Sequence, residues 1–188
     1  MIDISILKKH VSELVDMEES EFESIAAYFQ PVYRKKHQFL VQSGYDVGYE
    51  YFVVKGCIKS SVLDEYGKEH IVQFAMENWW ITDYYAFVHQ EKARMNIDCL
   101  EDCELLAISY QDRKTICKTS HNMEHFWATK TKYGYAALQN RILGLIKDSA
   151  KVRYENLIQQ YPTLIQRVPK KYIASFLGVS RETLSRLY

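Results

Sequence analysis

The sequence KKYIASFLGVSRETLSRL, residues 170–187, is typical of two short helices joined by a tight turn. Its apolar residues recur at helical spacing and would lie on facing inner surfaces: Ile173, Ala174, Leu177, Val179, Leu184 and Leu187. Gly178 can adopt the left-handed conformation that ends the first helix. The hydroxyl of Ser180 can cap the second helix near Thr183. The stretch therefore predicts a helix-turn-helix.

Burial of Leu184 and Leu187 would turn the polar side chains of the second helix outward together. These side chains are Arg181, Glu182, Ser185 and Arg186. An Arg can donate two hydrogen bonds to guanine O6 and N7, and a Glu can accept one from cytosine N4, so the surface suits the major groove of DNA. The alternative is a surface helix hairpin whose charges are only solvated.

The formal net charge of the chain is zero, but the charge is unevenly distributed. From Lys147 onward there are eight Lys or Arg residues and three acidic residues, so this segment carries +5 and the rest carries −5. A basic C-terminal module on an acidic N-terminal one would suit contacts with DNA phosphates. A solvated basic face would give the same imbalance.

The composition indicates an ordinary globular protein, since 188 residues with 47% hydrophobic content can form one large domain or two small ones. No apolar run approaches the ~18 residues that a membrane span needs. Asp3, Lys8 and Lys9 interrupt the N-terminus where a signal peptide would be apolar. We therefore expect a cytoplasmic protein with no membrane partner.

The four cysteines, Cys57, Cys99, Cys103 and Cys117, are too sparse for a disulfide scaffold and include no C-x-x-C pair. We interpret them as reduced, structural thiols. Cys99 and Cys103 have the spacing of two metal ligands, but the residues between them indicate a strand and its turn, so we expect no metal.

Residues 32–108 break into short runs rich in Val, Ile, Tyr and Phe, which turn residues separate. We expect strands at residues 38–42, 49–54, 58–63, 70–74, 96–99 and 104–108. Helical stripes precede them, at Ile6, Leu7, Val11 and Leu14 and at Phe22, Ile25, Ala26 and Phe29, where Pro31 closes the second segment. The pattern predicts an α+β fold with an N-terminal β-sandwich or jelly roll, whose interior could hold a small ligand.

The longest helical pattern runs from His121 to Lys147 and would span ~40 Å. This length suits pairing with the same helix of a second copy, although a helix lying flat on the β-domain would show a similar pattern. Ser149 can cap the next helix, which should end before Pro162. Residues 147–149 then form the expected hinge between domains.

These features together resemble the Crp–Fnr family of bacterial transcription regulators. The likeness rests on Gly44 and Gly56 at β turns, on KGCIKSSVLDEYGKEHIVQFA (residues 55–75), on the long helix and on SRETLSR (residues 180–186), and it covers nearly the whole chain. WWITD (residues 79–83) and the ending PKKYIASFLGVSRETLSRL are especially similar to members common in Bacteroidetes.

The resemblance implies roles for residues of the last two helices. Arg181, Glu182 and Arg186 match family positions that read bases, and Ser185 would add a further base contact. Residues that would contact the DNA backbone are Ser180, Thr183, Lys170 and Lys171. For each Lys, a merely solvated charge is the alternative.

The effector site departs from the cyclic-AMP-binding members, which hold the ribose and cyclic phosphate with a Gly-Glu pair and an Arg-Ser pair. Here Thr82-Asp83 replaces the first pair and Ala93-Arg94 the second, so the Arg is out of register and the Ser is missing. Leu138 and Gln139 stand where a polar pair would meet the adenine. A buried phosphate needs a paired cation, so the sequence argues against cyclic nucleotides. Aromatic side chains would fill the pocket that a nucleotide occupies in other members: Trp79, Trp80, Tyr84, Tyr85 and Phe87. An apolar or other small-molecule effector is the alternative.

Other cofactors and enzymatic activity find little support in the sequence. The N-terminal cysteine cluster of iron–sulfur sensors is absent, because the first cysteine is Cys57. His121 and His125 lack an evident third metal ligand. A metal-dependent jelly-roll enzyme would need clustered histidines, and His37, His70 and His89 stand alone. No nucleophile motif or phosphate-cradling glycine loop is present either.

We therefore expect an effector-type β-roll domain with flanking helices (residues 1–118), a long dimerisation helix (119–147) and a winged-helix-like helix-turn-helix domain without its wing (148–188). The expected function is that of a homodimeric, sequence-specific regulator of transcription that binds an inverted repeat in double-stranded DNA. RNA polymerase is a further expected partner. The alternative is a small-ligand-binding β-roll interaction module with no DNA role.

Overall fold

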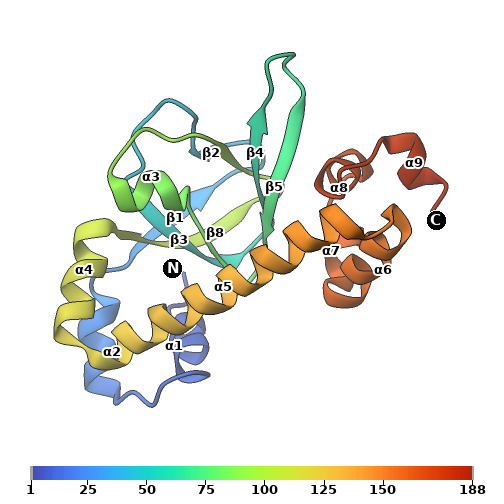
Figure 1. Ribbon diagram of the computed structural model, residues 1–188. Helices are drawn as coiled ribbons and strands as arrows, with labels where there is room; N and C mark the ends of the chain where they lie inside the picture. Colours follow the sequence, from blue (N-terminus) through green and yellow to red (C-terminus); the bar gives the residue numbers. More distant parts are fainter. Residues whose placement is uncertain (1, 188) are drawn as a thin grey trace. The chain divides into compact units, whose positions relative to one another are not determined.

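The computed structural model describes residues 2–187 (Figure 1). In chain order its elements are α1 (Ser5–Ser12), α2 (Glu19–Ala26), β1 (Gln30–Arg34), β2 (Phe39–Val41), β3 (Tyr49–Lys55), β4 (Ile58–Leu63), β5 (Glu69–Ala75), β6 (Trp80–Ile81), α3 (Tyr84–His89), β7 (Asn96–Cys99), β8 (Cys103–Ser109), α4 (Tyr110–Thr119), α5 (His121–Lys147), α6 (Ala150–Gln160), α7 (Pro162–Arg167), α8 (Lys170–Phe176) and α9 (Arg181–Ser185).

The chain divides into two compact units. The first comprises the residues up to Ser60 together with Phe74–Thr131, and the second comprises Ser61–Gln73 and the residues from Lys132 onward. The outer ends of β4 and β5 therefore belong with the C-terminal helices, and α5 begins in the first unit and ends in the second.

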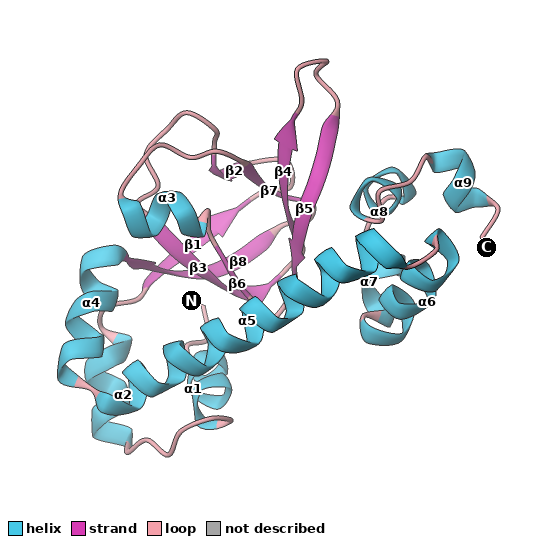
Figure 2. Cartoon of the chain, viewed as in Figure 1, coloured by secondary structure: helices cyan, strands magenta, loops and turns pink. Residues whose placement is uncertain are grey.

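Two four-stranded sheets form the β-roll, drawn in magenta in Figure 2. The first sheet has the strand order β1-β8-β3-β6 and the second has the order β2-β7-β4-β5. Strands β8 and β3 are central in the first sheet: β8 pairs antiparallel with β1 and β3, and β3 pairs with β8 and β6. The N-terminal β-sandwich that the sequence predicts is confirmed.

Strand β8 is apolar on both faces over Leu105–Ile108, because both faces of its sheet are covered. In β8, Leu105 and Ala107 pack in the core cluster between the sheets, whereas Leu106 and Ile108 pack in the cluster formed with the helices. Successive side chains of a strand point to opposite faces, so this division follows from the period of two. All four side chains are at most 2% exposed.

Helices α1, α2 and α4 and the beginning of α5 share a hydrophobic core with the first sheet. Residues from these helices in that core include Leu7, Val11, Phe22, Ile25, Ile116, Met123 and Phe126. Trp80 is central to it, with ring centroids 5.1 Å from Phe52 and 6.2 Å from Phe126. Burial of one large apolar side chain stabilises a fold by ~1.5–3 kcal/mol, so this core binds the helices firmly to the sheet.

Helix α5 spans His121–Lys147, the range that the sequence predicts. Its first turns bury Met123, Phe126 and Trp127, whereas Leu138 and Ile142 further along are exposed. Neither this helix nor another among residues 2–187 combines the length and apolar character that crossing a membrane requires.

The C-terminal helices α6 to α9 contribute a second, smaller set of buried side chains. These are Tyr154, Leu157, Leu164, Val168, Ile173, Ala174, Leu177 and Leu184. Ser149 caps α6, since its Oγ accepts the N–H of Val152 at 3.3 Å. Helix α6 ends at Gln160 and Pro162 begins α7, so the predicted cap and the predicted helix end are both confirmed.

Candidate nucleic-acid interface

Helices α8 and α9 are joined by a turn whose geometry the local sequence determines. Gly178 has φ of +67°, a left-handed conformation that costs glycine little. The N–H of Val179 bonds to the carbonyl of Ala174 at 3.0 Å, and the N–H of Gly178 bonds to that of Ser175 at 3.1 Å. This pair of bonds is a Schellman motif, which satisfies carbonyls left open at the end of α8.

Ser180 begins the second helix as the sequence predicts. Its Oγ accepts the N–H of Thr183 at 3.1 Å and lies 3.1 Å from the Thr183 hydroxyl. The cap satisfies one of the backbone donors that every helix start leaves unpaired, and it orients α9 relative to the turn.

The inner and outer faces of the two helices also match the prediction. Ile173, Ala174, Leu177 and Leu184 are buried, and Val179 and Leu187 are half-buried. The exposed side chains on α9 and its C-terminal end are Arg181, Glu182, Thr183, Ser185 and Arg186. We call this set the α9 face. It offers two guanidinium donors, one carboxylate acceptor and two hydroxyls to a ligand.

Glu182 is held in its ionised form on the α9 face. Its own backbone N–H, the Ser180 hydroxyl and the guanidinium groups of Arg181 and Arg186 keep the pKa of its carboxyl below the usual value. A carboxylate of this kind only accepts hydrogen bonds, so it would select a donor group such as the amino group of a cytosine.

Lys170 and Lys171 are exposed in the first turn of α8. The Nζ atom of Lys171 lies 4.6 Å from the centroid of the Tyr172 ring, a cation–π distance. Both side chains are accessible to an anionic ligand such as a phosphate.

Two half-buried arginines that sequence reasoning missed hold the end of α8. Arg153 of α6 donates from Nε to the Leu177 carbonyl at 3.0 Å. Arg141 of α5 donates to the Phe176 carbonyl at 3.0 Å, and its guanidinium lies 4.2 Å from the centroid of the Phe176 ring. Positive charge at a helix C-terminus complements the helix dipole. Neither arginine stands out in the sequence, because its partner at the end of α8 lies at least 24 residues away.

The same unit ties α8 to strand β5. Ser175 Oγ accepts the N–H of Ile71 at 3.0 Å and donates to the Glu69 carbonyl at 3.1 Å. Arg141 donates to the Ile71 carbonyl at 3.2 Å. One serine and one arginine thus contact three backbone groups of β5 and set the position of α8.

The predicted effector residues Thr82, Asp83 and Arg94 come together in the first unit. Asp83 is 1% exposed and caps α3, with Oδ1 accepting the N–H of Ala86 at 3.2 Å and Oδ2 accepting the N–H of Arg94 at 2.7 Å. Thr82 donates to the Tyr49 carbonyl at 2.9 Å. Backbone donors that an anion could use are therefore already occupied by the carboxylate of this chain.

The other predicted effector residues do not supply a phosphate site. The guanidinium of Arg94 is exposed, where it bonds to Glu91 at 3.1 Å and lies 3.5 Å from the centroid of the Tyr85 ring. Leu138 and Gln139 are exposed on the part of α5 that belongs to the second unit. A buried phosphate beside Asp83 would face like charge without a paired cation.

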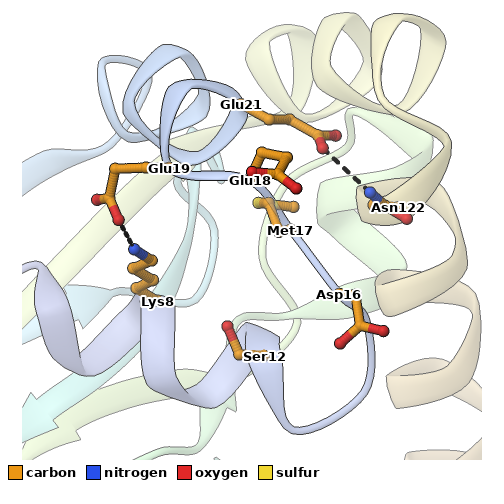
Figure 3. A pocket seen from close by; sticks show the side chains of 8 residues that line it. All are labelled: Lys8, Ser12, Asp16, Met17, Glu18, Glu19, Glu21 and Asn122. Atoms are coloured by element: carbon orange, nitrogen blue, oxygen red, sulfur yellow. Dashed lines mark hydrogen bonds and ion pairs between the residues drawn. The ribbon is translucent and has the colours of Figure 1, made fainter.

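The cavity beside α1 and α2 is poorly suited to a nucleotide. It has a volume of about 490 Å³ and is lined by four acidic side chains and one Lys (Figure 3). Its charged groups are partly paired, since Lys8 binds Glu19, and Glu21 accepts from Asn122 at 3.0 Å. The acidic lining would repel a phosphate. Among residues 2–187, no group of three or more His, Cys, Asp or Glu side chains could hold a metal ion.

Comparison with known proteins agrees with this architecture. Residues 31–120 match the family described as "Cyclic nucleotide-binding domain". This part of the chain is similar to cyclic nucleotide-binding domains. Comparison with curated proteins finds no match.

Solved structures extend the likeness beyond this domain. FixK2 from Bradyrhizobium japonicum shares 16% identity over 85% of this chain and 82% of its own, with a TM-score of 0.72. The c-di-GMP responsive regulator CLP from Xanthomonas campestris shares 14% sequence identity over 90% of this chain and 89% of its own, also with a TM-score of 0.72. A Crp–Fnr family regulator from Eubacterium rectale shares 16% sequence identity over 92% of this chain and 82% of its own, with a TM-score of 0.66.

These identities establish the fold. The chain therefore has the fold of the Crp–Fnr regulators, which confirms the resemblance read from the sequence. The similarity to Bacteroidetes members is not tested by these comparisons and stays a prediction.

Proposed function

We propose that this chain is a sequence-specific DNA-binding regulator of transcription in which α8 and α9 form the helix-turn-helix. The observation that carries the proposal is the α9 face, where a buried Leu184 and the Ser180 cap leave Arg181, Glu182 and Arg186 exposed together. The structural neighbours named above are regulators, which supports a regulatory role over an enzymatic one.

Within this proposal, the side chains divide into two groups by what they would contact. Arg181, Glu182, Ser185 and Arg186 read base edges in the major groove. The DNA backbone is bound by Lys170, Lys171, Ser180 and Thr183, which fix the register of the protein on the duplex. The basic charge of the C-terminal segment supplies the phosphate attraction that both groups need.

The proposed regulator is a homodimer formed through α5. From Tyr135 onward this helix exposes an apolar stripe at alternating spacings of three and four residues: Tyr135, Leu138, Ile142 and Leu145. This is the spacing of the a and d positions in a coiled coil. A second copy of α5 is the occupant that fits a helix-long stripe of this period. The domain division is then 1–118, 119–147 and 148–188.

The proposed effector is not a cyclic nucleotide, because the Asp83 carboxylate occupies the backbone donors near α3. An uncharged small molecule, or no effector at all, is compatible with the first unit. RNA polymerase as a partner of the DNA-bound dimer stays a prediction.

Selection of bound duplexes from a random pool tests DNA recognition directly. We expect the full chain to enrich an inverted repeat at moderate salt. Arg181→Ala should lose this enrichment, while Lys92→Ala is a matched control that removes one exposed charge paired with Asp46 on the β-roll. If the chain shows no preference among sequences even at low salt, the alternative of a β-roll interaction module is favoured.

The same selection with cyclic AMP or cyclic GMP in excess tests the effector proposal separately. We expect an unchanged consensus and an unchanged affinity. An affinity increase with either nucleotide would contradict the role assigned to Asp83 and leave the DNA-binding proposal intact.

A further inference from the structure

Three of the four cysteines gather at the end of the β-roll where β7 leads into β8. Cys57, Cys99 and Cys103 are buried. The Sγ atom of Cys103 lies 3.8 Å from the Cys57 carbonyl and 3.3 Å from that of Glu101. Gly56 is required beside it, because a Cβ at position 56 would lie 2.5 Å from Cys103 Sγ and the φ there is +115°.

Cys99 and Cys103 are direct neighbours through their thiols. A hydrogen bond between the two sulfur groups raises the pKa of Cys99 and lowers the pKa of Cys103. Asp98 acts on Cys99 in the same direction as that bond, while Glu101 opposes it at Cys103. Of the two, Cys103 is therefore the one more readily present as thiolate, which is the nucleophilic form.

Cys103 is also the thiol of this pair that lines a cavity. The cavity has a volume of about 310 Å³ and includes Arg34, Lys35, Lys55, Asp102 and Glu104 in its lining. Three cationic side chains outnumber the two carboxylates of this lining, although Lys35 is paired with Asp102 at 2.8 Å. A small polar oxidant can therefore approach Cys103 through this cavity.

We propose that Cys99 and Cys103 form a peroxide-sensitive dithiol, in which Cys103 reacts with hydrogen peroxide and Cys99 resolves the product into a disulfide. The Cys103 thiolate attacks one peroxide oxygen, the O–O bond breaks, and hydroxide leaves and takes up a proton. The Cys103 sulfenic acid then loses its oxygen as water when Cys99 Sγ attacks the sulfur and gives up its own proton. The two thiols are oxidised and the peroxide is reduced to two waters.

The site joins the two sheets of the roll, which gives oxidation a structural consequence. Cys99 ends β7 in one sheet and Cys103 begins β8 in the other. Between them, Asp102 accepts from Lys35 Nζ at 2.8 Å and from the Lys36 N–H at 2.9 Å. A disulfide would fix this turn covalently.

Peptide mapping of the full wild-type chain after treatment with stoichiometric hydrogen peroxide tests the proposal without any substitution. We expect one peptide link between Cys99 and Cys103, reversed by dithiothreitol. Cys117, a half-buried thiol on α4 whose pKa is raised by burial, should remain reduced. Oxidation of Cys117 with no link between positions 99 and 103 would overturn the proposal.

Variants separate the two roles. Cys99→Ser should stop at a sulfenic acid on Cys103 that dimedone captures, and Cys103→Ser should leave Cys99 unmodified. Cys117→Ser is the matched control and should form the same link as wild type. Dimedone capture at Cys99 in the Cys103→Ser chain, at a rate similar to that of Cys103, would contradict the assigned order. Circular dichroism melting of each variant verifies folding, and neither outcome depends on DNA binding.

Discussion

Arg181 is the single residue whose loss should change base preference most. Its side chain is exposed in the first turn of α9, where it can donate two hydrogen bonds to one guanine. Arg181→Ala should cost about 1–3 kcal/mol on the preferred duplex and relax the preference at one base pair. Fluorescence anisotropy with the selected duplex and its single-base variants measures both effects. An equal loss on specific and random duplexes would refute the base-reading role.

Lys170 provides the contrast, because it is proposed to contact phosphate. Lys170→Ala should weaken binding to every duplex by a similar factor and make the slope of log affinity against log salt shallower by about 0.9. A loss confined to the preferred sequence would count against this assignment. The two substitutions each remove one positive charge, so they differ only in what the side chain contacts.

His10 gives the first unit a defined response to pH. The ring is buried, 5.1 Å from the Phe52 centroid and 5.7 Å from that of Phe126, and neither ring nitrogen has a hydrogen-bond partner among residues 2–187. Burial, with help from the charge of Lys130, lowers the pKa of His10 to about 4. Glu13 lies 3.6 Å from Nδ1 but is largely exposed, so burial prevails.

The sign of this effect follows from proton binding. An unfolded His has a pKa near 6.5, so between pH 6.5 and 4 the unfolded chain binds more protons than the folded one. The contribution of the neutral His10 ring to the free energy of unfolding is therefore fully present above pH 6.5. About 2 kcal/mol of the free energy of unfolding should be lost between pH 7 and pH 5. Urea unfolding at both pH values measures the loss. His10→Phe should reduce it, whereas His121→Gln, at a highly exposed site, should not.

Features of the candidate site that depend on neighbouring residues could be predicted from the sequence, whereas contacts between residues far apart in the chain could not. The Ser180 cap and the exposed Arg181 follow from helical periodicity within one short stretch. The structure also brings Asp83 to the backbone N–H of Arg94, eleven residues away, across a helix that the sequence did not indicate. Contacts of this kind depend on tertiary packing, which a residue pattern does not encode.

Among the elements, α5 is expected to decide the oligomeric state. Leu138 is half exposed in the centre of the apolar stripe on α5. Leu138→Asp would bury an unpaired charge in each half of a paired interface, so the dissociation constant of the dimer should rise more than about a hundredfold, which is about 3 kcal/mol. Sedimentation velocity should then show monomers.

The control for this prediction lies on the same helix. Asn140 is exposed and lies on the side of α5 opposite the stripe, given 3.6 residues per turn. Asn140→Asp adds the same charge and should leave the dimer intact. If wild type and both variants sediment alike as monomers, dimerisation through α5 is refuted.

Elements with a strong period were predicted well, and those set by packing were missed. Residues 58–63 and 96–99 are strands with the predicted bounds, and α5 matches as well. Strand β1 was not expected, because Pro31 was interpreted as a helix end. In the structure Pro31 lies in β1 opposite Leu106 of β8. Because β1 is an edge strand of its sheet, the missing N–H of the proline is tolerated. Helix α3 has the strand-like sequence YYAFVH, and the Asp83 cap starts it as a helix.

For the whole molecule, a twofold dimer fixes the spacing of the DNA site. Two recognition helices related by twofold symmetry should read half-sites about 34 Å apart, one turn of the double helix. Insertion of about five base pairs between the half-sites rotates one of them to the opposite side of the duplex, so affinity should fall to that of a single half-site. Gel-shift titration of both duplexes measures this. Equal affinity would show that the two half-sites are bound independently.

The contacts of Ser175 and Arg141 with β5 also protect a sheet edge against pairing with a strand of another molecule. Strand β5 is the last strand of its sheet, and such a border normally leaves N–H and C=O groups open to any passing strand. Here the N–H of Ile71 and the carbonyls of Glu69 and Ile71 are already bonded by a serine and an arginine. The Glu69–Ile71 stretch of this edge is therefore not open to intermolecular strand addition, the first step of aggregation into cross-β fibrils.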